Sequence, residues 1–276
     1  MLTISIDPIA FNIGSLEVRW YGIMIALGVA SLLITMPREA KRLGIQRDIY
    51  SVFFWAVVGG LVGGRLTYVV YYWQHFMANP REILGFQGLA QNGMIIGIIV
   101  AALIYMRVTR MRFSTLLSIG DTLAVGAPLA LAIGRIGCTI NGCCYGAAAP
   151  DLPFALVYTN PDSLAPLNVP THPTPLYHLL WNLIVFAIVW LLRRRFKPEG
   201  SLFFFFLCIF AVGDFGIRFF RTDVPVLWGL RQAQVLDLGI LAVFLPWLII
   251  KMRRLQRQAL ATEIAGEVKP EQNRGD

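Results

Sequence analysis

Charged residues are scarce in this chain. They make up only 14% of its 276 residues, whereas hydrophobic residues make up 57%. A soluble domain carries about one charged residue in four, so the composition excludes an ordinary soluble protein. Apolar stretches of about 20 residues recur, which is long enough to cross the hydrocarbon core of a bilayer. The sequence therefore predicts an all-α, polytopic membrane protein.

Basic residues are missing from the start of the chain. No Lys or Arg precedes Arg19, so the first segment lacks the basic region of a cleavable signal peptide, and we expect it to be retained. Seven apolar stretches are predicted to form transmembrane helices. They cover residues 19–37, 51–73, 89–106, 115–133, 174–192, 201–220 and 233–250.

Lysine is absent from one side of the predicted topology. Clusters of Arg and Lys follow the first, third, fifth and seventh spans, and all of them are cytoplasmic only if the N-terminus is outside. Residues 1–250 then form one seven-helix transmembrane domain, 135–173 a small extracytoplasmic loop region, and 251–276 a polar cytoplasmic tail. Because topology explains these clusters, the net charge of +8 does not indicate nucleic-acid binding.

A second set of basic residues consists of arginines only, on the outer side or within the membrane. Arg65 and Arg218 fall within apolar spans, where a charge is costly unless it faces a partner or a cavity. A guanidinium suits bidentate binding of phosphate or carboxylate. Snorkelling to the interface stays open for three of the set, Arg19, Arg81 and Arg231. The full set is Arg19, Arg65, Arg81, Arg135, Arg218, Arg221 and Arg231.

Cysteine is also rare, and three of the four cysteines lie in the stretch GRIGCTINGCCYG at 134–146. The spacing of Cys138, Cys143 and Cys144 does not match the paired ligands of structural zinc, so we expect no metal. A disulfide from Cys138 to Cys143 or Cys144, and a thiol redox site, stay open.

The rest of that stretch favours an anion-binding loop. Its four glycines allow close backbone approach and left-handed turns, and exposed amides in such turns bind anions. Arg135 adds a fixed positive charge, and Asn141 adds a donor and an acceptor. This interpretation accounts for the glycines and the arginine, whereas the cysteine interpretations account only for the cysteines.

The same stretch resembles the signature of the prolipoprotein diacylglyceryl transferase family. Further segments resemble other motifs of that family, in order along the chain. They are VRWYGIMIALG at 18–28, GGRLTYVVYY at 63–72, DTLAVGAPLALAIGR at 121–135, HPTPLYHLLWN at 172–182, FFRTD at 219–223 and Gln234.

The resemblance implies a reaction, its partners and its place in the cell. The family transfers the diacylglyceryl group of phosphatidylglycerol to the lipobox cysteine thiol of a prolipoprotein, forming a thioether and releasing glycerol phosphate. This is the first step of bacterial lipoprotein maturation. It implies an active face toward the outer side of the cytoplasmic membrane, a lipid and a signal peptide as partners, and no metal or organic cofactor.

Five positions match functional residues of the family. Arg135 and Arg221 match arginines that would hold the phosphate, and Arg65 matches an arginine that would pair with the phosphate or an acid. Tyr21 matches a tyrosine that would hydrogen-bond the headgroup or the nucleophile. Gly146 matches the glycine that closes the signature, where a side chain would intrude.

Some family positions are occupied by other residue types. Asn92 replaces a histidine at the start of the third span, and Cys138 and Cys143 replace Asn and Glu of the best-known members. Because Asn cannot act as a general base near neutral pH, His172 becomes the first candidate base and Asp237 the second.

The end of the sixth span shows a swap of charges. The family pattern of Arg, then Glu four residues later, is reversed in Asp214 and Arg218. An acid followed by a base at this spacing is a favourable helical pair, so we expect the ion pair to be kept. Three other functions stay open: a lipid- or thiol-transfer enzyme with a changed acceptor, a non-enzymatic protein that binds or transports anionic lipid, and a membrane thiol oxidoreductase.

Overall fold

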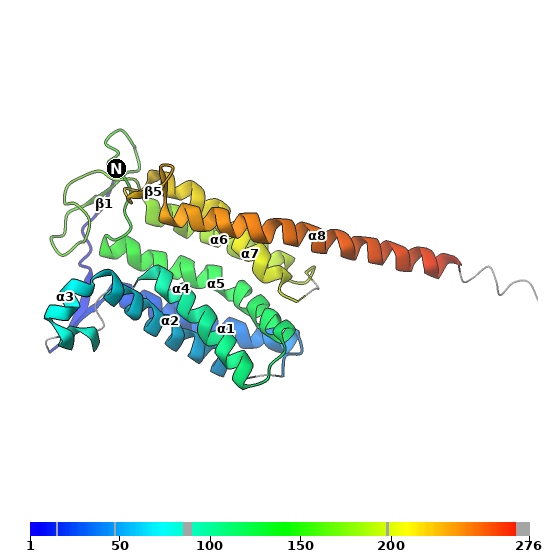
Figure 1. Ribbon diagram of the computed structural model, residues 1–276. Helices are drawn as coiled ribbons and strands as arrows, with labels where there is room; N and C mark the ends of the chain where they lie inside the picture. Colours follow the sequence, from blue (N-terminus) through cyan, green and yellow to red (C-terminus); the bar gives the residue numbers. More distant parts are fainter. Residues whose placement is uncertain (15, 47, 85–89, 197–198, 269–276) are drawn as a thin grey trace, which may run out of the picture. The chain divides into compact units, whose positions relative to one another are not determined.

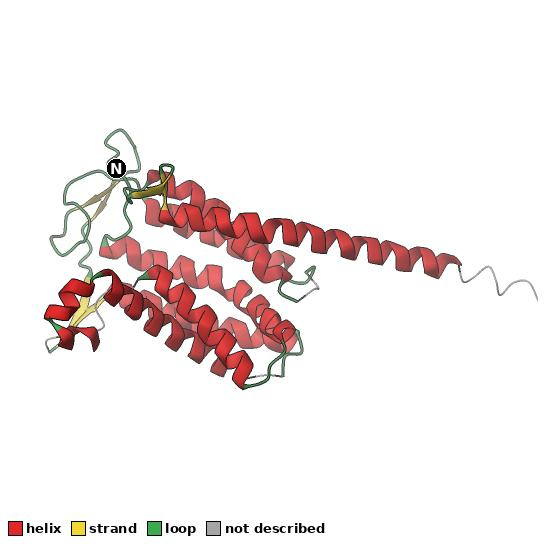
Figure 2. Cartoon of the chain, viewed as in Figure 1, coloured by secondary structure: helices red, strands yellow, loops and turns green. Residues whose placement is uncertain are grey.

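The computed structural model describes residues 1–276 except 15, 47, 85–89, 197–198 and 269–276. Most of the described chain is helical, with short strands near the N-terminus and beside the helix ends (Figure 2). The α-helices are α1 (Trp20–Arg42), α2 (Ile49–Tyr71), α3 (Trp73–Ala78), α4 (Gln91–Val108), α5 (Phe113–Asn141), α6 (Thr174–Leu192), α7 (Ser201–Ile217) and α8 (Gln232–Val268). The short 3₁₀ helices are η1 (Pro80–Leu84) and η2 (Arg218–Phe220).

Six helical segments in the described chain are long and apolar enough to cross a membrane. The predicted third span corresponds to a shorter apolar helix, Asn92–Val108. The architecture is therefore that of a mostly helical, multi-pass membrane protein, as the composition predicts. The six segments are Trp20–Arg42, Ile49–Tyr71, Phe113–Asn141, Thr174–Leu192, Ser201–Phe220 and Gln232–Arg254.

Helix α5 is longer than predicted. It continues to Asn141 instead of ending at 133, so the first half of the signature stretch is helical and not a loop. Gly137 is tolerated there because it lies where α1 passes close by: an added Cβ would be 3.0 Å from Tyr21 Cα. The helix is followed by Gly142, whose φ of 69° is the left-handed conformation that commonly follows a helix. Helix α8 likewise runs past the predicted end of the seventh span, to Val268.

The chain forms two compact units. One combines Met1–Leu32 with Leu123–Asp276, and the other is Leu33–Thr122. In the first unit, the core packs α5, α6 and α7 through residues such as Val125, Val185 and Phe206.

Short strands lie beside the helix ends of the first unit (Figure 1). Strand β1 (Leu2–Ile4) pairs in parallel with β4 (Leu156–Tyr158), and the fully buried Tyr158 Oη donates to the carbonyl of Thr139 in α5 at 3.0 Å. The strand pair is thereby joined to the helix end that carries the signature. The other strands are β2 (Ile9–Ile13), β3 (Leu16–Arg19), β5 (Pro225–Leu227) and β6 (Leu230–Arg231).

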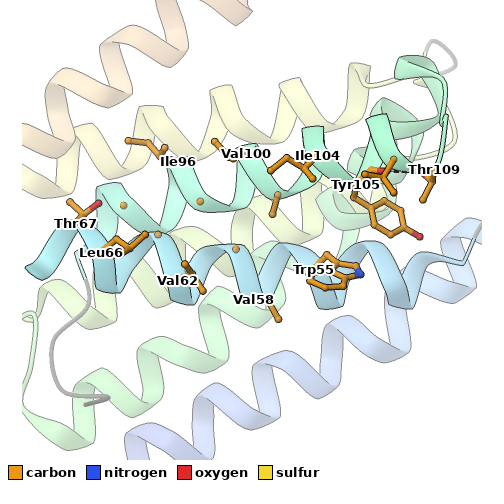
Figure 3. A pocket seen from close by; sticks show the side chains of 16 residues that line it. Trp55, Val58, Val62, Leu66, Thr67, Ile96, Val100, Ile104, Tyr105 and Thr109 are labelled. Atoms are coloured by element: carbon orange, nitrogen blue, oxygen red, sulfur yellow. Dashed lines mark hydrogen bonds between the residues drawn. The ribbon is translucent and has the colours of Figure 1, made fainter. Parts of the chain in front are cut away.

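In the second unit, α2 and α4 pack at glycines. An added Cβ on Gly59 would lie 2.5 Å from the Gly97 carbonyl oxygen, and one on Gly63 would lie 2.8 Å from Gly97 Cα. Small residues at this spacing let membrane helices approach closely. Apolar side chains such as Trp55 and Ile104 flank the glycines and line a groove of about 710 Å³ (Figure 3).

Candidate active site

The end of α5 brings two arginines to the signature stretch. Arg135 is half-buried in the last turns of the helix, where Thr139 Oγ1 donates to its carbonyl at 2.9 Å. The buried Asn141 accepts a hydrogen bond from Arg19 Nη1 at 3.5 Å. Arg19 also pairs with Glu17 at 3.4 Å. Arg19 therefore contacts the signature and is more than an interfacial residue.

The chain turns sharply after α5. Cys144 has a φ of 62°, which is uncommon for a residue with a side chain and occurs where the surroundings fix the backbone. Its carbonyl accepts from Thr174 Oγ1 at 2.5 Å. Two residues later the Gly146 N–H donates to the His172 carbonyl at 3.0 Å. The turn is thus held against the start of α6.

Gly146 has no room for a side chain. An added Cβ would lie 2.5 Å from the Phe220 carbonyl oxygen and 2.6 Å from His172 Cβ. The neighbouring Ala147 N–H donates to the same Phe220 carbonyl at 2.7 Å. The glycine therefore allows three chain segments to meet beside Arg221.

The turn also gathers the three thiols of the signature. Cys138, Cys143 and Cys144 place their sulfur atoms within 4.8 Å of one another, and all are free. Hydrogen bonds with Cys138 and Cys143 hold the pKa of Cys144 well below its usual range, and the charge of Arg135 acts in the same direction. The pKa of Cys143 is raised by the same contacts with Cys138 and Cys144. The contacts of the cluster thus shift the pKa values of Cys144 and Cys143 in opposite directions.

Arg221 lies at the same place and is tightly held. Its side chain is 14% exposed and makes two contacts with Asp223, at 2.9 Å from Nε and 3.1 Å from Nη2. Burial alone would lower the pKa of Arg221, but hydrogen bonds with Cys144 and Asp223 raise it. Arg231 Nη2 donates to the Arg221 carbonyl. This arginine is therefore fixed in position and remains charged.

The predicted ion pair of the sixth span is confirmed. Arg218 Nε lies 2.9 Å from Asp214 Oδ2, and Arg218 Nη1 lies 3.2 Å from Asp223. His178 Nδ1 approaches the other oxygen of Asp214 at 3.4 Å. The reversed charges thus form a buried pair, and Asp223 links this pair to Arg221.

Two other predicted residues belong to the same unit. Tyr21, in the first turn of α1, is 39% exposed and lies within electrostatic range of Arg135 and the three thiols. His172 Nδ1 lies 3.3 Å from Tyr177 Oη, and its ring packs 4.9 Å from that of Phe220. One unit thus contains Tyr21, Arg135, Asn141, Gly146, His172 and Arg221.

The remaining candidates have different surroundings. Arg65 belongs to the second unit, where it donates to the carbonyls of Ile83, at 2.9 Å, and Glu82. Its guanidinium also lies 5.1 Å from the Phe76 ring centroid. Asp237, the second candidate base, is buried in α8. The predicted pairing of Arg65 with a phosphate or an acid stays a prediction.

Comparisons with known proteins match almost the whole chain. The family model described as prolipoprotein diacylglyceryl transferase matches residues 8–250. A phosphatidylglycerol–prolipoprotein diacylglyceryl transferase of Dehalococcoides mccartyi strain 195 is 36% identical over 94% of this chain and 98% of its own length. Proteins of the same name from Clostridioides difficile and Geobacter sulfurreducens are 35% and 32% identical, over 84% and 90% of this chain and 90% and 96% of their own lengths. The chain belongs to the prolipoprotein diacylglyceryl transferase family.

Three neighbours of the site in this family member did not emerge as candidates from the sequence. Asp223 holds Arg221 and Arg218, and its signal was its place in the quoted FFRTD motif. Arg19 lies two residues before Tyr21, yet its contact with Asn141 depends on how β3 enters α1. His178 is buried and lies beside Asp214 of α7, a contact that depends on how α6 and α7 pack.

Proposed function

We propose that this member of the family transfers the diacylglyceryl group of phosphatidylglycerol to the lipobox cysteine thiol of prolipoproteins. The new bond is a thioether, and glycerol phosphate is released. Membership of the family across residues 8–250 supports this reaction. The structural observation that carries the proposal is that the Ala147 N–H donates to the Phe220 carbonyl at 2.7 Å, which brings Arg221 to the stretch that contains Arg135.

The two arginines suit the phosphate of the lipid. The C–O bond that breaks leaves its electron pair on the phosphate, so negative charge develops there during the reaction. Arg135 and Arg221 both carry fixed positive charge, and Asp223 orients the latter. Such preorganised donors stabilise the leaving group more than the intact lipid, which lowers the barrier.

The half-exposed Tyr21 hydroxyl is suited to hydrogen-bond the headgroup or the incoming sulfur. His172 is the candidate base for the thiol proton, since its Cβ lies beside Gly146 and its ring packs against that of Phe220. Asn141 completes the proposed headgroup set through the buried amide that contacts Arg19.

The proposed topology places this chemistry at the outer face of the bacterial cytoplasmic membrane. We take Asn92–Val108 as the third of seven spans, in addition to the six longer segments. With the N-terminus outside, the basic clusters are cytoplasmic. The chemistry would then occur where lipobox cysteines emerge after export.

The direct test uses purified protein, phosphatidylglycerol and a lipobox peptide. We expect a peptide heavier by one diacylglyceryl group, detected by mass spectrometry, together with an equal amount of glycerol phosphate. A peptide with Ser in place of the lipobox Cys is the control and should remain unmodified. Lipid binding without product would identify a non-enzymatic lipid-binding protein, and a product on a different acceptor would identify a changed specificity.

A further inference from the structure

The groove between α2 and α4 has no role in the proposed chemistry. Its volume is about 710 Å³. Glycines at the helix contact, such as Gly59 and Gly97, form its floor, and apolar side chains of both helices form its walls (Figure 3). These wall residues are exposed, so the described chain leaves the groove open. They include Val62, Leu66, Ile96, Val100, Ile104 and Val108.

One end of the groove is lined by side chains that are typical of a membrane interface. Trp55 of α2 lies there, together with Tyr105 and Thr109 at the end of α4 (Figure 3). The Thr109 Oγ1 donates to the Tyr105 carbonyl at 2.7 Å. Because Trp and Tyr are enriched where a span reaches the lipid headgroups, we expect the groove to run from the hydrocarbon region to the headgroup level at this end.

Three arginines gather at the same end of the groove. Arg107 lies in the last turn of α4, and Arg110 and Arg112 lie in the short connection to α5. All three are exposed, and none makes an ion pair within the described part of the chain. Arg110 has a φ of 51°, and the Met111 N–H donates to the Met106 carbonyl at 2.9 Å. This tight turn therefore keeps three positive charges close to the end of the groove.

The carboxylates of the neighbouring α1–α2 connection are already engaged. Asp48 accepts hydrogen bonds from the Tyr50 N–H at 3.0 Å and from Ser51 Oγ at 2.6 Å, and so caps α2. Glu39 pairs with Arg42 at 2.5 Å. These two acids do not neutralise the arginines that follow α4, which leaves those arginines available for an external anion.

We infer that the groove binds a two-chain phospholipid with an anionic headgroup, with an acyl chain between α2 and α4 and the phosphate on the arginines that follow α4. A guanidinium binds a phosphate through two parallel hydrogen bonds. The inference goes beyond the proposed function: this site lies in the second unit, whereas the residues proposed to act on the substrate lie in the first. A lipid that contacts both walls stabilises the helix pair, since the site is lost when the helices separate.

Charge favours this lipid over two other apolar occupants. A signal peptide carries a basic segment before its apolar helix, and the basic segment stays on the side where the basic clusters of this chain lie. A second copy of the chain, in the same orientation, would bring its own arginines to the same level. Like charges at one interface oppose association, whereas an anionic lipid supplies the opposite charge.

The test uses the fluorescence of Trp55, which is 49% exposed in the groove. The chain is placed in phosphatidylcholine bilayers with a minor fraction of dibrominated phosphatidylserine or, at equal bromine content, dibrominated phosphatidylcholine. Phosphatidylserine is anionic but is not the substrate of the proposed reaction. Since bromine quenches tryptophan on contact, we expect stronger quenching by the anionic lipid, and Trp55→Phe should remove most of the difference. Trp190→Phe is the matched control, because Trp190 is exposed beside Arg193 of another basic cluster, and it should keep the difference.

The arginines and the groove are tested separately. Arg110→Gln should lower the preference for phosphatidylserine about fivefold, and the triple variant with Arg107→Gln and Arg112→Gln should lower it about 10²-fold. The double variant Arg194→Gln, Arg195→Gln is the control: these exposed arginines follow α6, and their loss should change the preference by less than about twofold. Val100→Phe narrows the groove without a change of charge and should also remove the difference in quenching.

Several outcomes would overturn the inference. Equal quenching by the two lipids would do so, as would equal losses of the difference in Trp55→Phe and Trp190→Phe. Protection of Trp55 by an added lipobox signal peptide, or by a higher density of the chain in the bilayer, would assign the groove to the peptide or to a second copy instead. The transferase assay is separate: a chain that binds phosphatidylserine as described but forms no thioether would refute the proposed function and leave this site standing.

Discussion

Glycines make close backbone contacts in both the signature turn and the α2–α4 pair, but different groups surround them. In the α2–α4 pair, Gly59 and Gly97 meet across two helices, and the groove beside them is lined by apolar residues. At the signature turn, Gly146 meets backbone and side chains from two other segments, and arginines and thiols lie next to it. Close packing in the first case joins helices, whereas in the second it fixes charged groups.

The arginines of the two regions differ in the same way. Arg65 binds carbonyl groups and an aromatic ring of its own unit. Arg221 is held by a carboxylate and contacts a thiol. A carboxylate thus holds the Arg221 side chain in one position, where it is suited to bind an incoming anion. This position agrees with the family resemblance, in which Arg221 matches an arginine that would hold the phosphate.

The largest expected effect separates the signature arginine from an exposed one. Arg135→Ala should lower the rate of thioether formation by about 10²- to 10³-fold, because the leaving phosphate loses a preorganised charge. Arg81→Ala is the control: Arg81 is an exposed residue of η1, and its loss should change the rate by less than about twofold. Equal losses in the two variants would contradict a headgroup role for the end of α5.

The next effect concerns the glycine of the turn. Gly146→Ala should lower activity by about 10²-fold, because the new methyl group would press on the Phe220 carbonyl next to Arg221. Gly216→Ala is the matched control, since an added Cβ there meets nothing within 4 Å. The initial rates of thioether formation at saturating lipid are compared between the two variants. Similar rates would show that activity does not depend on the exact position of the turn.

A smaller effect is expected in the reactivity of the cluster with a thiol reagent. At about pH 6, an ordinary thiol is almost entirely protonated, whereas a lowered pKa favours the thiolate form of Cys144. Iodoacetamide should therefore modify Cys144 at least about tenfold faster than Cys143, whose pKa is raised. Peptide mapping by mass spectrometry measures both rates.

The sign of the pH dependence follows from the direction of these shifts. As the pH rises toward 9, ordinary thiols ionise and become more reactive, while the reactivity of Cys144 should change little because its pKa is lowered. Arg221→Ala removes a group that lowers the pKa of Cys144, so modification at pH 6 should slow. Equal modification rates for Cys143 and Cys144 at pH 6 would contradict the opposite shifts of their pKa values.

The smallest effect tests the apolar region. Gly97→Ala places a methyl group against the Gly59 carbonyl and should lower the melting temperature by about 5 °C, because overpacking costs about 1–3 kcal/mol. Gly239→Ala, in an open part of α8, should leave it within about 2 °C. Thermal unfolding in detergent measures the difference, and a raised melting temperature for Gly97→Ala would show that the helices can separate without penalty.

Helix positions were predictable because length and hydropathy determine which segments can lie in a bilayer. The predicted span at 174–192 coincides with α6, and the pair Asp214–Arg218 was predictable because both residues lie on one helix at a known spacing. The end of α5 was predicted too early, since glycines in a sequence favour a turn, whereas Gly137 is needed inside the helix for contact with α1.

The thiol cluster was not predictable for a different reason. Its geometry depends on the left-handed backbone at Cys144, a conformation that the residue type disfavours. The contact of Arg221 with Cys144 joins residues from distant parts of the chain, and a local pattern contains no information about such a contact. The arginines could be identified from their position on the outer side and from family resemblance, while only the fold brings the thiols together with Arg221.

The pairing of β1 with β4 has a consequence for the order of events during synthesis. Leu2 pairs with Leu156, so the first strand is made long before its partner, and α1, α2, α4 and α5 are made in between. At a synthesis rate of about 10 residues per second, β1 waits on the order of 15 s for β4. Since β4 also anchors the end of α5 through Tyr158, the turn that carries the arginines and thiols assembles only after more than half of the chain has left the ribosome.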